Sequence, residues 1–153
     1  MPALDVGGCR LENDGTGYWT GTLRLPAWLA RFGPRAGAMY VELPGDGDEE
    51  EPAAARVAGL RWLIAHDAAV LDRIVAAVNA EPRRGKIAPS TVIFHDVVRG
   101  KSPYVGFSFR CAWDREHGLG VMMHGLRVVE VGGADVAVLE WIARRDAKRS
   151  AAT

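Results

Sequence analysis

The sequence predicts an α+β fold, in which an antiparallel sheet of about five to six strands carries two to three helices packed on one face. Several short segments alternate apolar and polar residues as strands do, whereas residues 52–79 repeat apolar residues at helical spacing. The second half of the chain adds strand-like segments separated by short turns. The length of 153 residues matches a single domain, predicted to span residues 1–153.

Two strands are expected before the helical region. The first occupies residues 18–25, where Trp19 and Leu23 share one face and Pro26 ends the segment. The second occupies residues 38–43, and we expect the two to be neighbours in one sheet. The acidic, glycine-rich loop that follows is typical of the entry to a helix.

Residues 52–79 are expected to form two consecutive helices, or one kinked helix, laid over the sheet. His66 and Asp67 interrupt the apolar stripe, and Asp67 is placed to cap the second helix. The apolar positions that define the two stripes are Val57, Leu60, Ile64, Leu71, Ile74, Val75 and Val78.

After a basic turn the chain is predicted to be mostly β-structure. Residues 91–98 offer a strand whose alternation is poor, so that either face can be the buried one. Residues 103–113 alternate more clearly than any other segment. One face of that strand carries Val105, Phe107, Phe109, Cys111 and Trp113, and the other carries Gly106, Ser108 and Arg110.

The last strands and a final helix complete the predicted fold. A hairpin is expected from residues 119–123 and 126–131, joined at 124–125. Tight two-residue hairpin turns require a positive φ, and the glycine that ends this turn can adopt it. Asp135 is expected to cap the final helix, and residues 144–153 are expected to be a frayed basic tail.

Composition excludes several classes of function. Nineteen basic and nineteen acidic residues give a net charge of zero, so neither nucleic acid nor a membrane surface is expected as a partner. The N-terminus lacks a secretion signal and no apolar run is long enough to cross a bilayer, which predicts a cytoplasmic location. Cys9 and Cys111 are isolated cysteines, and no cofactor is expected.

The segment WDREHGLGV, residues 113–121, gathers polar side chains between an apolar strand and a glycine-rich turn. Asp114, Glu116 and His117 are candidate catalytic residues and candidate metal ligands, because carboxylates and a neutral imidazole together suit divalent metals such as zinc or manganese. Their spacing does not match the i, i+4 pairs that helices present to a metal. A strand that continued past Trp113 would be needed to bring Asp114 and Glu116 to one face.

The same residues also suit a purely structural turn. Asp114 can accept a hydrogen bond from the backbone, Gly118 can supply positive φ, and Glu116 can pair with Arg115 or Arg110. Residue types alone favour this structural interpretation and leave a ligand or catalytic site as the alternative.

Other polar residues give weaker signals. The His–Asp pairs at 66–67 and 95–96 are interpreted as coincidental, one at a helix junction and one at a strand edge. Trp28 follows a proline among apolar residues and is expected to be partly exposed, and His124 lies at a turn. Trp28, Arg115 and His124 are therefore the candidate residues of a binding surface.

The chain resembles a family of uncharacterised bacterial domains whose members carry a segment like FxCxWDxEHGLGV, followed by an RVVExG strand. These segments correspond here to residues 109–121 and 127–132, and the early YWTGTLRLP and EPAAARVAGLRWL also resemble the family, so that the resemblance covers most of the chain. It implies no established activity. Such small domains resemble those encoded near bacterial toxin systems, where some act as immunity proteins that bind and block a toxin.

Two functional hypotheses result. The first is a small cytosolic binding protein, non-enzymatic and immunity-like, whose polar loop contacts another protein. The second is a metal-assisted hydrolase that uses Asp114, Glu116 and His117, and it requires a deep pocket with converging side chains. The sequence specifies neither the partner nor the substrate nor the oligomeric state.

Overall fold

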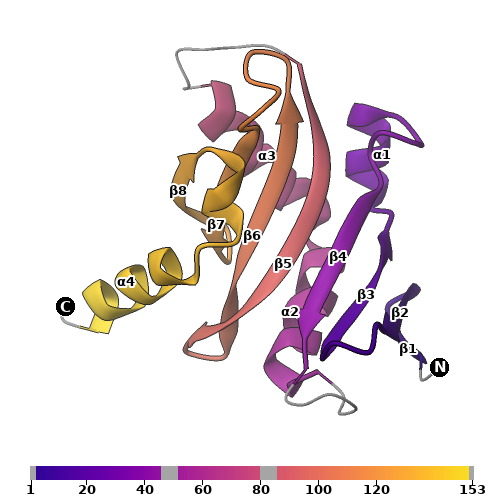
Figure 1. Ribbon diagram of the computed structural model, residues 1–153, viewed down its shortest axis with the longest axis vertical. Helices are drawn as coiled ribbons and strands as arrows, with labels where there is room; N and C mark the ends of the chain where they lie inside the picture. The colour runs from indigo at the N-terminus through magenta and orange to yellow at the C-terminus, as the bar shows by residue number, and fades with distance from the viewer. Residues whose placement is uncertain (1–2, 46–51, 80–85, 152–153) are drawn as a thin grey trace.

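The computed structural model of the protein describes residues 3–45, 52–79 and 86–151 (Figure 1). Eight strands form one sheet whose spatial order, β1 to β8, is also their order along the chain. All neighbouring strands are antiparallel except β4 and β5, which are parallel. The prediction of a purely antiparallel sheet with five to six strands, covered by helices on one face, is therefore wrong.

The strands are β1 (Ala3–Val6), β2 (Cys9–Asn13), β3 (Tyr18–Leu23), β4 (Met39–Pro44), β5 (Ile87–Arg99), β6 (Ser102–Cys111), β7 (Leu119–His124) and β8 (Arg127–Gly132). The described helices are α1 (Pro26–Phe32), α2 (Ala54–Ala65), α3 (Asp67–Asn79), the short 3-10 helix η1 (Ala134–Ala137) and α4 (Glu140–Ala151). The acidic run at 46–51 and the basic turn at 80–85, both expected to be loops, lie outside the described residues.

The N-terminal hairpin of β1 and β2 was not predicted. Its turn consists of Gly7 and Gly8, whose φ angles of 58° and 90° suit a tight hairpin turn. In β2, Cys9 and Leu11 are buried while Arg10 is exposed, so this short strand does show the period-2 pattern.

The parallel pairing of β4 with β5 results from the connection between them. A parallel neighbour requires a long crossover, and helices α2 and α3 supply it. The expectation of two consecutive helices over the sheet is confirmed, because α2 ends at Ala65 and α3 begins at Asp67. Asp67 does not cap its own helix with its side chain; its carboxylate accepts the backbone N–H of Ala27 at 2.8 Å, near the start of α1.

One face of the sheet is covered by α1, α2 and α3, which lie behind the sheet in Figure 1. Trp28 of α1 is fully buried there, and its ring lies 5.5 Å from that of Phe107 and 5.9 Å from that of Phe109. The expectation that Trp28 is partly exposed is therefore wrong, because the seven-residue helix α1 turns the indole inward onto β6. Trp28 is excluded from any binding surface.

The opposite face carries a second, smaller core under η1 and α4 (Figure 1). Gly106 of β6 and Gly120 of β7 lie under η1, where an added Cβ would meet the backbone of Ala137 or Gly133 at less than 3.0 Å. The side chain of His95 from β5 reaches the same place, with its Nε2 at 2.7 Å from the Ala137 carbonyl oxygen. Hence η1 rests directly on the backbone of the sheet.

Strand β5 alternates poorly because its pairing with β6 is irregular at two places, between Pro89 and Thr91 and between Phe94 and Val98.

The β7–β8 hairpin differs slightly from the prediction. His124 pairs with Arg127, so the turn residues are Gly125 and Leu126. Gly125 has a φ of 59° and no described non-glycine residue has positive φ, which fits a type II′ turn with glycine first.

The predicted frayed tail differs from the structure, in which α4 continues to Ala151. Asp146 of α4 binds this helix to the sheet. Its carboxylate accepts hydrogen bonds from the Tyr104 hydroxyl at 2.6 Å and from both terminal nitrogens of Arg127, and the Arg127 bonds lower the pKa of Asp146 to about 2. Asp135 does not cap α4 either, because it lies within η1 and α4 begins only at Glu140. None of the described helices is long and apolar enough to span a membrane.

We predict that Asp146→Asn lowers the free energy of unfolding by about 1–2 kcal/mol, because Tyr104 and Arg127 lose a charged acceptor. Urea unfolding at pH 7 measures this. Glu140→Gln is the matched control, since Glu140 on the same helix forms an exposed i, i+4 pair with Arg144, and its charge interaction with His95 requires the protonated imidazole, which the lowered pKa disfavours at pH 7. Equal effects of the two substitutions would contradict the proposed docking of α4 through Asp146.

We also predict a pH dependence of stability that depends on His95. Burial lowers the pKa of His95 below its usual 6.5, although the Ala137 carbonyl and Glu140 oppose this shift. The unfolded chain therefore binds a proton at His95 at a higher pH than the folded protein does, and stability falls as the pH falls below about 6.5. The contribution of this one group is at most about 1.4 kcal/mol per pH unit.

His95→Gln keeps a donor for the Ala137 carbonyl without a titrating group. Urea unfolding between pH 7.5 and 5.5 is expected to give a flatter dependence for this variant than for the wild type. An identical pH dependence in both proteins would show that His95 contributes nothing to it.

Candidate functional site

The candidate loop, residues 112–118, joins β6 to β7 as a closed turn at one end of the sheet. The Asp114 carbonyl oxygen accepts the Gly118 N–H at 2.9 Å and the Cys111 thiol at 3.3 Å. The Asp114 carboxylate accepts the backbone N–H of His117 at 3.0 Å, and Gly118 has a φ of 64°. Both features of the structural interpretation, the Asp114 bond to the backbone and the positive φ of Gly118, are therefore present.

The loop is also fixed from the side by the segment that follows β8. The Ala134 N–H donates to the His117 carbonyl oxygen at 2.8 Å. A Cβ at Gly118 would lie 2.8 Å from the Phe109 carbonyl oxygen and 3.1 Å from the Ala134 Cβ. The glycine at 118 is therefore required twice, by its φ and by the close approach of its neighbours.

A hollow of about 520 Å³ lies between this loop and the start of η1. Three carboxylates line it, from Asp114, Glu116 and Asp135, so the hollow is acidic in a chain whose net charge is zero. The complete lining is Trp113, Asp114, Glu116, His117, Gly118, Leu119, Gly132, Gly133 and Asp135.

The sequence predicted Asp135 as the cap of the final helix and did not indicate that it lies beside the loop. Asp135 reaches the hollow because β7 and β8 pair Gly120 with Gly132, which returns the chain to the level of the loop. Two consecutive glycines, Gly132 at the end of β8 and Gly133 directly after it, were the available signal, since a Cβ on Gly132 would lie 2.9 Å from Val136 Cγ2.

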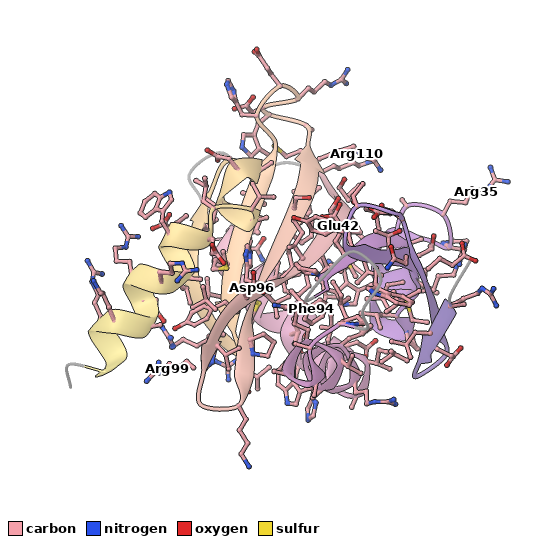
Figure 2. The ribbon with its side chains drawn as sticks, turned by 60° about the horizontal axis from the view of Figure 1, so that its bottom comes forward. Arg35, Glu42, Phe94, Asp96, Arg99 and Arg110 are labelled. Carbon is pink, nitrogen blue, oxygen red and sulfur yellow. The ribbon has the colours of Figure 1, made fainter. Side chains whose placement is uncertain are left out.

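The side chains of Arg115, Glu116 and His117 are exposed, and the loop stands clear of the body at the top of Figure 2. His117 Nδ1 lies 3.1 Å and 3.2 Å from the two Asp114 carboxylate oxygens, but the His117 side chain is 69% exposed. Ion pairs with this much solvent contact contribute little free energy. In the described part of the chain, Glu116 forms no ion pair with Arg110 or Arg115.

Metal binding by the three candidate residues would require their side chains to converge on one point. Within residues 3–45, 52–79 and 86–151, no three side chains of His, Cys, Asp or Glu lie close enough together to hold a metal ion. The Asp114 carboxylate already accepts a backbone N–H, and the strand ends at Cys111 rather than continuing past Trp113. Asp114 and Glu116 consequently do not share a strand face.

The remaining candidate residues have separate structural contacts. His124 is only partly exposed: its Nε2 lies 3.2 Å from the carbonyl oxygens of both Arg99 and Ser102, and its ring centroid lies 4.6 Å from that of Tyr104. His66 ends α2 and stacks on Trp62 at 4.6 Å. The His–Asp pairs at 66–67 and 95–96 therefore have no site in common.

Figure 2 shows that Arg110 and Arg99 mark opposite ends of the β5–β6 pair. Arg110 lies next to the end of β6 that leads into the loop, and Arg99 lies next to the hairpin at the other end. His124 belongs to the Arg99 end. Of the three binding-surface candidates, only Arg115 is exposed beside the hollow.

Residues 84–139 match the model of a domain of unknown function, DUF6985. The match begins near β5, includes β6, β7, β8 and η1, and ends just before α4. It therefore contains the loop and its hollow but is shorter than the resemblance implied. No curated protein and no solved structure matches the chain.

We predict that Gly118→Ala lowers the free energy of unfolding by roughly 3 kcal/mol, because both positive φ and the contact with the Phe109 carbonyl become unfavourable. Gly100→Ala is the matched control. Gly100 has nearly the same φ, 66°, but an added Cβ meets nothing within 4 Å. The control is expected to cost about 1–2 kcal/mol.

Thermal or urea unfolding of the two variants measures the difference. Equal losses would mean that the contact of Gly118 with β6 contributes nothing beyond backbone strain.

Proposed function

We propose that the protein is a non-enzymatic binding protein, and that the hollow beside the 112–118 loop receives a basic side chain of a protein partner. The observation that carries this proposal is that Asp114, Glu116 and Asp135 all line one hollow, whose lining also includes Trp113. Carboxylates attract a cation, and an indole attracts it further through its ring face.

Arginine is the partner residue that suits these groups best. A planar guanidinium can donate to two carboxylates at once and stack on Trp113, whereas a lysine ammonium offers only a point charge. The backbone of the hollow is already fixed by the Ala134–His117 hydrogen bond, so that little ordering is required when a partner binds.

The exposed residues of the loop extend the proposed interface. The side chains of Arg115 and His117 are exposed, and the His117 ring contacts the Asp114 carboxylate at the edge of the hollow. They are suited to the rim of an interface, where charges set the association rate and the choice of partner.

We further propose a cytoplasmic, immunity-like role, in which the bound protein is a toxin of the same bacterium. This step rests on the resemblance to small domains encoded near toxin systems.

Site-specific photo-crosslinking in the native host tests the proposal. A photoreactive residue in place of Arg115 is expected to capture one partner polypeptide, whereas the same residue in place of Asp72, on the exposed side of α3, is not. With the purified partner, Glu116→Gln combined with Asp135→Asn is expected to weaken binding at least about tenfold, because a guanidinium loses its charged acceptors. Asp72→Asn should leave the affinity unchanged.

Two results would overturn the proposal. One is an affinity that the Glu116 and Asp135 substitutions leave unchanged. The other is stoichiometric binding of zinc or manganese that His117→Ala abolishes, which would instead favour the metal-assisted hydrolase with Asp114, Glu116 and His117 as ligands.

A further inference from the structure

An apolar cavity lies at the end of the sheet opposite the loop, between the sheet and helices α2 and α3. Its volume is about 210 Å³. Phe107 and Met123 of the sheet are almost fully buried, whereas Trp62 of α2 is only partly buried. The lining consists of Ala58, Gly59, Trp62, Leu63, Val70, Lys101, Ser102, Pro103, Val105, Phe107, Met123 and Gly125.

The cavity lies beside the contact that α2 makes with the β5–β6 hairpin. Helix α2 is held against the β5–β6 hairpin at Gly59, where an added Cβ would lie 2.6 Å from Pro103 Cγ. Helix α2 contacts β5 and β6, whereas α3 contacts β8. The cavity lies over Val105 and Phe107 of β6 and Met123 of β7, and its helical lining comes from Ala58 to Leu63 of α2 and Val70 of α3.

The size of the cavity indicates the size of its occupant. Protein interiors rarely contain voids larger than a water molecule, and large voids lower stability. A dry apolar cavity of about 150 Å³ is sufficient to bind benzene. A cavity of about 210 Å³ is therefore large enough for one aromatic ring with a short substituent.

The chemistry of the lining indicates the class of ligand. Trp62, Phe107 and Met123 offer aromatic faces and a polarisable sulfur to a ring. The polar side chains of the lining belong to Lys101 and Ser102, which are exposed residues at the β5–β6 turn. A ring inside the cavity can thus direct an anionic group toward the ammonium of Lys101 and the hydroxyl of Ser102.

The geometry points to a binding site for a small aromatic monocarboxylate, with the ring between α2 and β6 and the carboxylate at Lys101. This site is separate from the acidic hollow of the proposed function, which lies at the other end of β6 and β7. Failure of either proposal leaves the other untouched.

Phenylacetate is the probe, and ¹H–¹⁵N correlation spectra of the full chain are the readout. We expect saturable shifts of the Trp62 indole N–H and of the Gly59 and Gly125 amides, with a Kd of about 1 mM or tighter, which ten heavy atoms can supply. Phenethylamine has a similar ring and the opposite charge, and it is expected to bind at least about tenfold more weakly.

Ala58→Phe tests the location, because Ala58 is an exposed helical residue at the edge of the cavity and a phenyl ring there closes the entrance. Ala54→Phe is the matched control, since Ala54 is exposed one turn earlier in α2 and does not line the cavity. We expect the first variant to abolish the shifts and the second to preserve them. Both positions are on the surface, so both variants should fold.

Lys101→Glu tests the charge, with Lys86→Glu as its control at the far end of β5. The first substitution is expected to weaken phenylacetate binding at least about tenfold and the second to leave it unchanged. The proposal is overturned if phenylacetate gives no saturable shifts up to 20 mM, at roughly twenty times the expected Kd. It is also overturned if the shifts survive Ala58→Phe, or if phenethylamine binds as well as phenylacetate.

Discussion

The segment from Gly133 to Ala137 lies directly on the backbone of β6 and β7, and the second half of the fold depends on this contact. Neither Gly106 nor Gly120 leaves room for a side chain there, because an added Cβ on either would approach the segment more closely than real Cβ atoms do. The His95 side chain fixes the same segment from β5 by donating to the Ala137 carbonyl. One backbone-on-backbone contact thus places η1, and η1 in turn places both α4 and the candidate loop.

This contact explains most of the WDREHGLGV motif without any chemistry. Gly118 and Gly120 permit the close approach, Asp114 closes the turn, and the His117 carbonyl accepts the Ala134 N–H. The side chains of Arg115, Glu116 and His117 are not needed for any of these contacts. They are the part of the motif that is available for a partner, and Glu116 and His117 border the acidic hollow that Asp135 completes.

The sequence predicted the elements whose pattern is local. Alternation located β3, β4 and β6, and helical spacing located α2 and α3, because each of these presents one apolar face to the main core. It did not predict the β1–β2 hairpin or the parallel pairing of β4 with β5. Residues 91–98 and 119–123 were predicted as strands, although Val97 of β5, Tyr104 of β6 and Met122 of β7 face the second core and so weaken the simple alternation of these strands. Trp28 appeared exposed because nothing local reveals that α1 turns it onto β6.

The candidate site was likewise predictable only in part. The Asp114 hydrogen bond to the backbone and the positive φ of Gly118 were predictable, since both are properties of a short turn. The contribution of Asp135 was not, because it depends on the register of β7 with β8. The apolar cavity under α2 and α3 likewise brings together residues of two helices and two strands that lie far apart in the sequence, which no local pattern expresses.

Native-state hydrogen exchange on a triple variant tests most directly whether the loop is a fixed turn that displays free side chains. In Arg115→Ala, Glu116→Ala and His117→Ala combined, the amides of residues 117, 118 and 134 should keep their wild-type protection, because their acceptors are Asp114 and the His117 carbonyl. Global stability should stay within about 0.5 kcal/mol of the wild type. Loss of protection at these three amides in a variant that is otherwise folded would contradict the account, since it would show that the exposed side chains hold the turn.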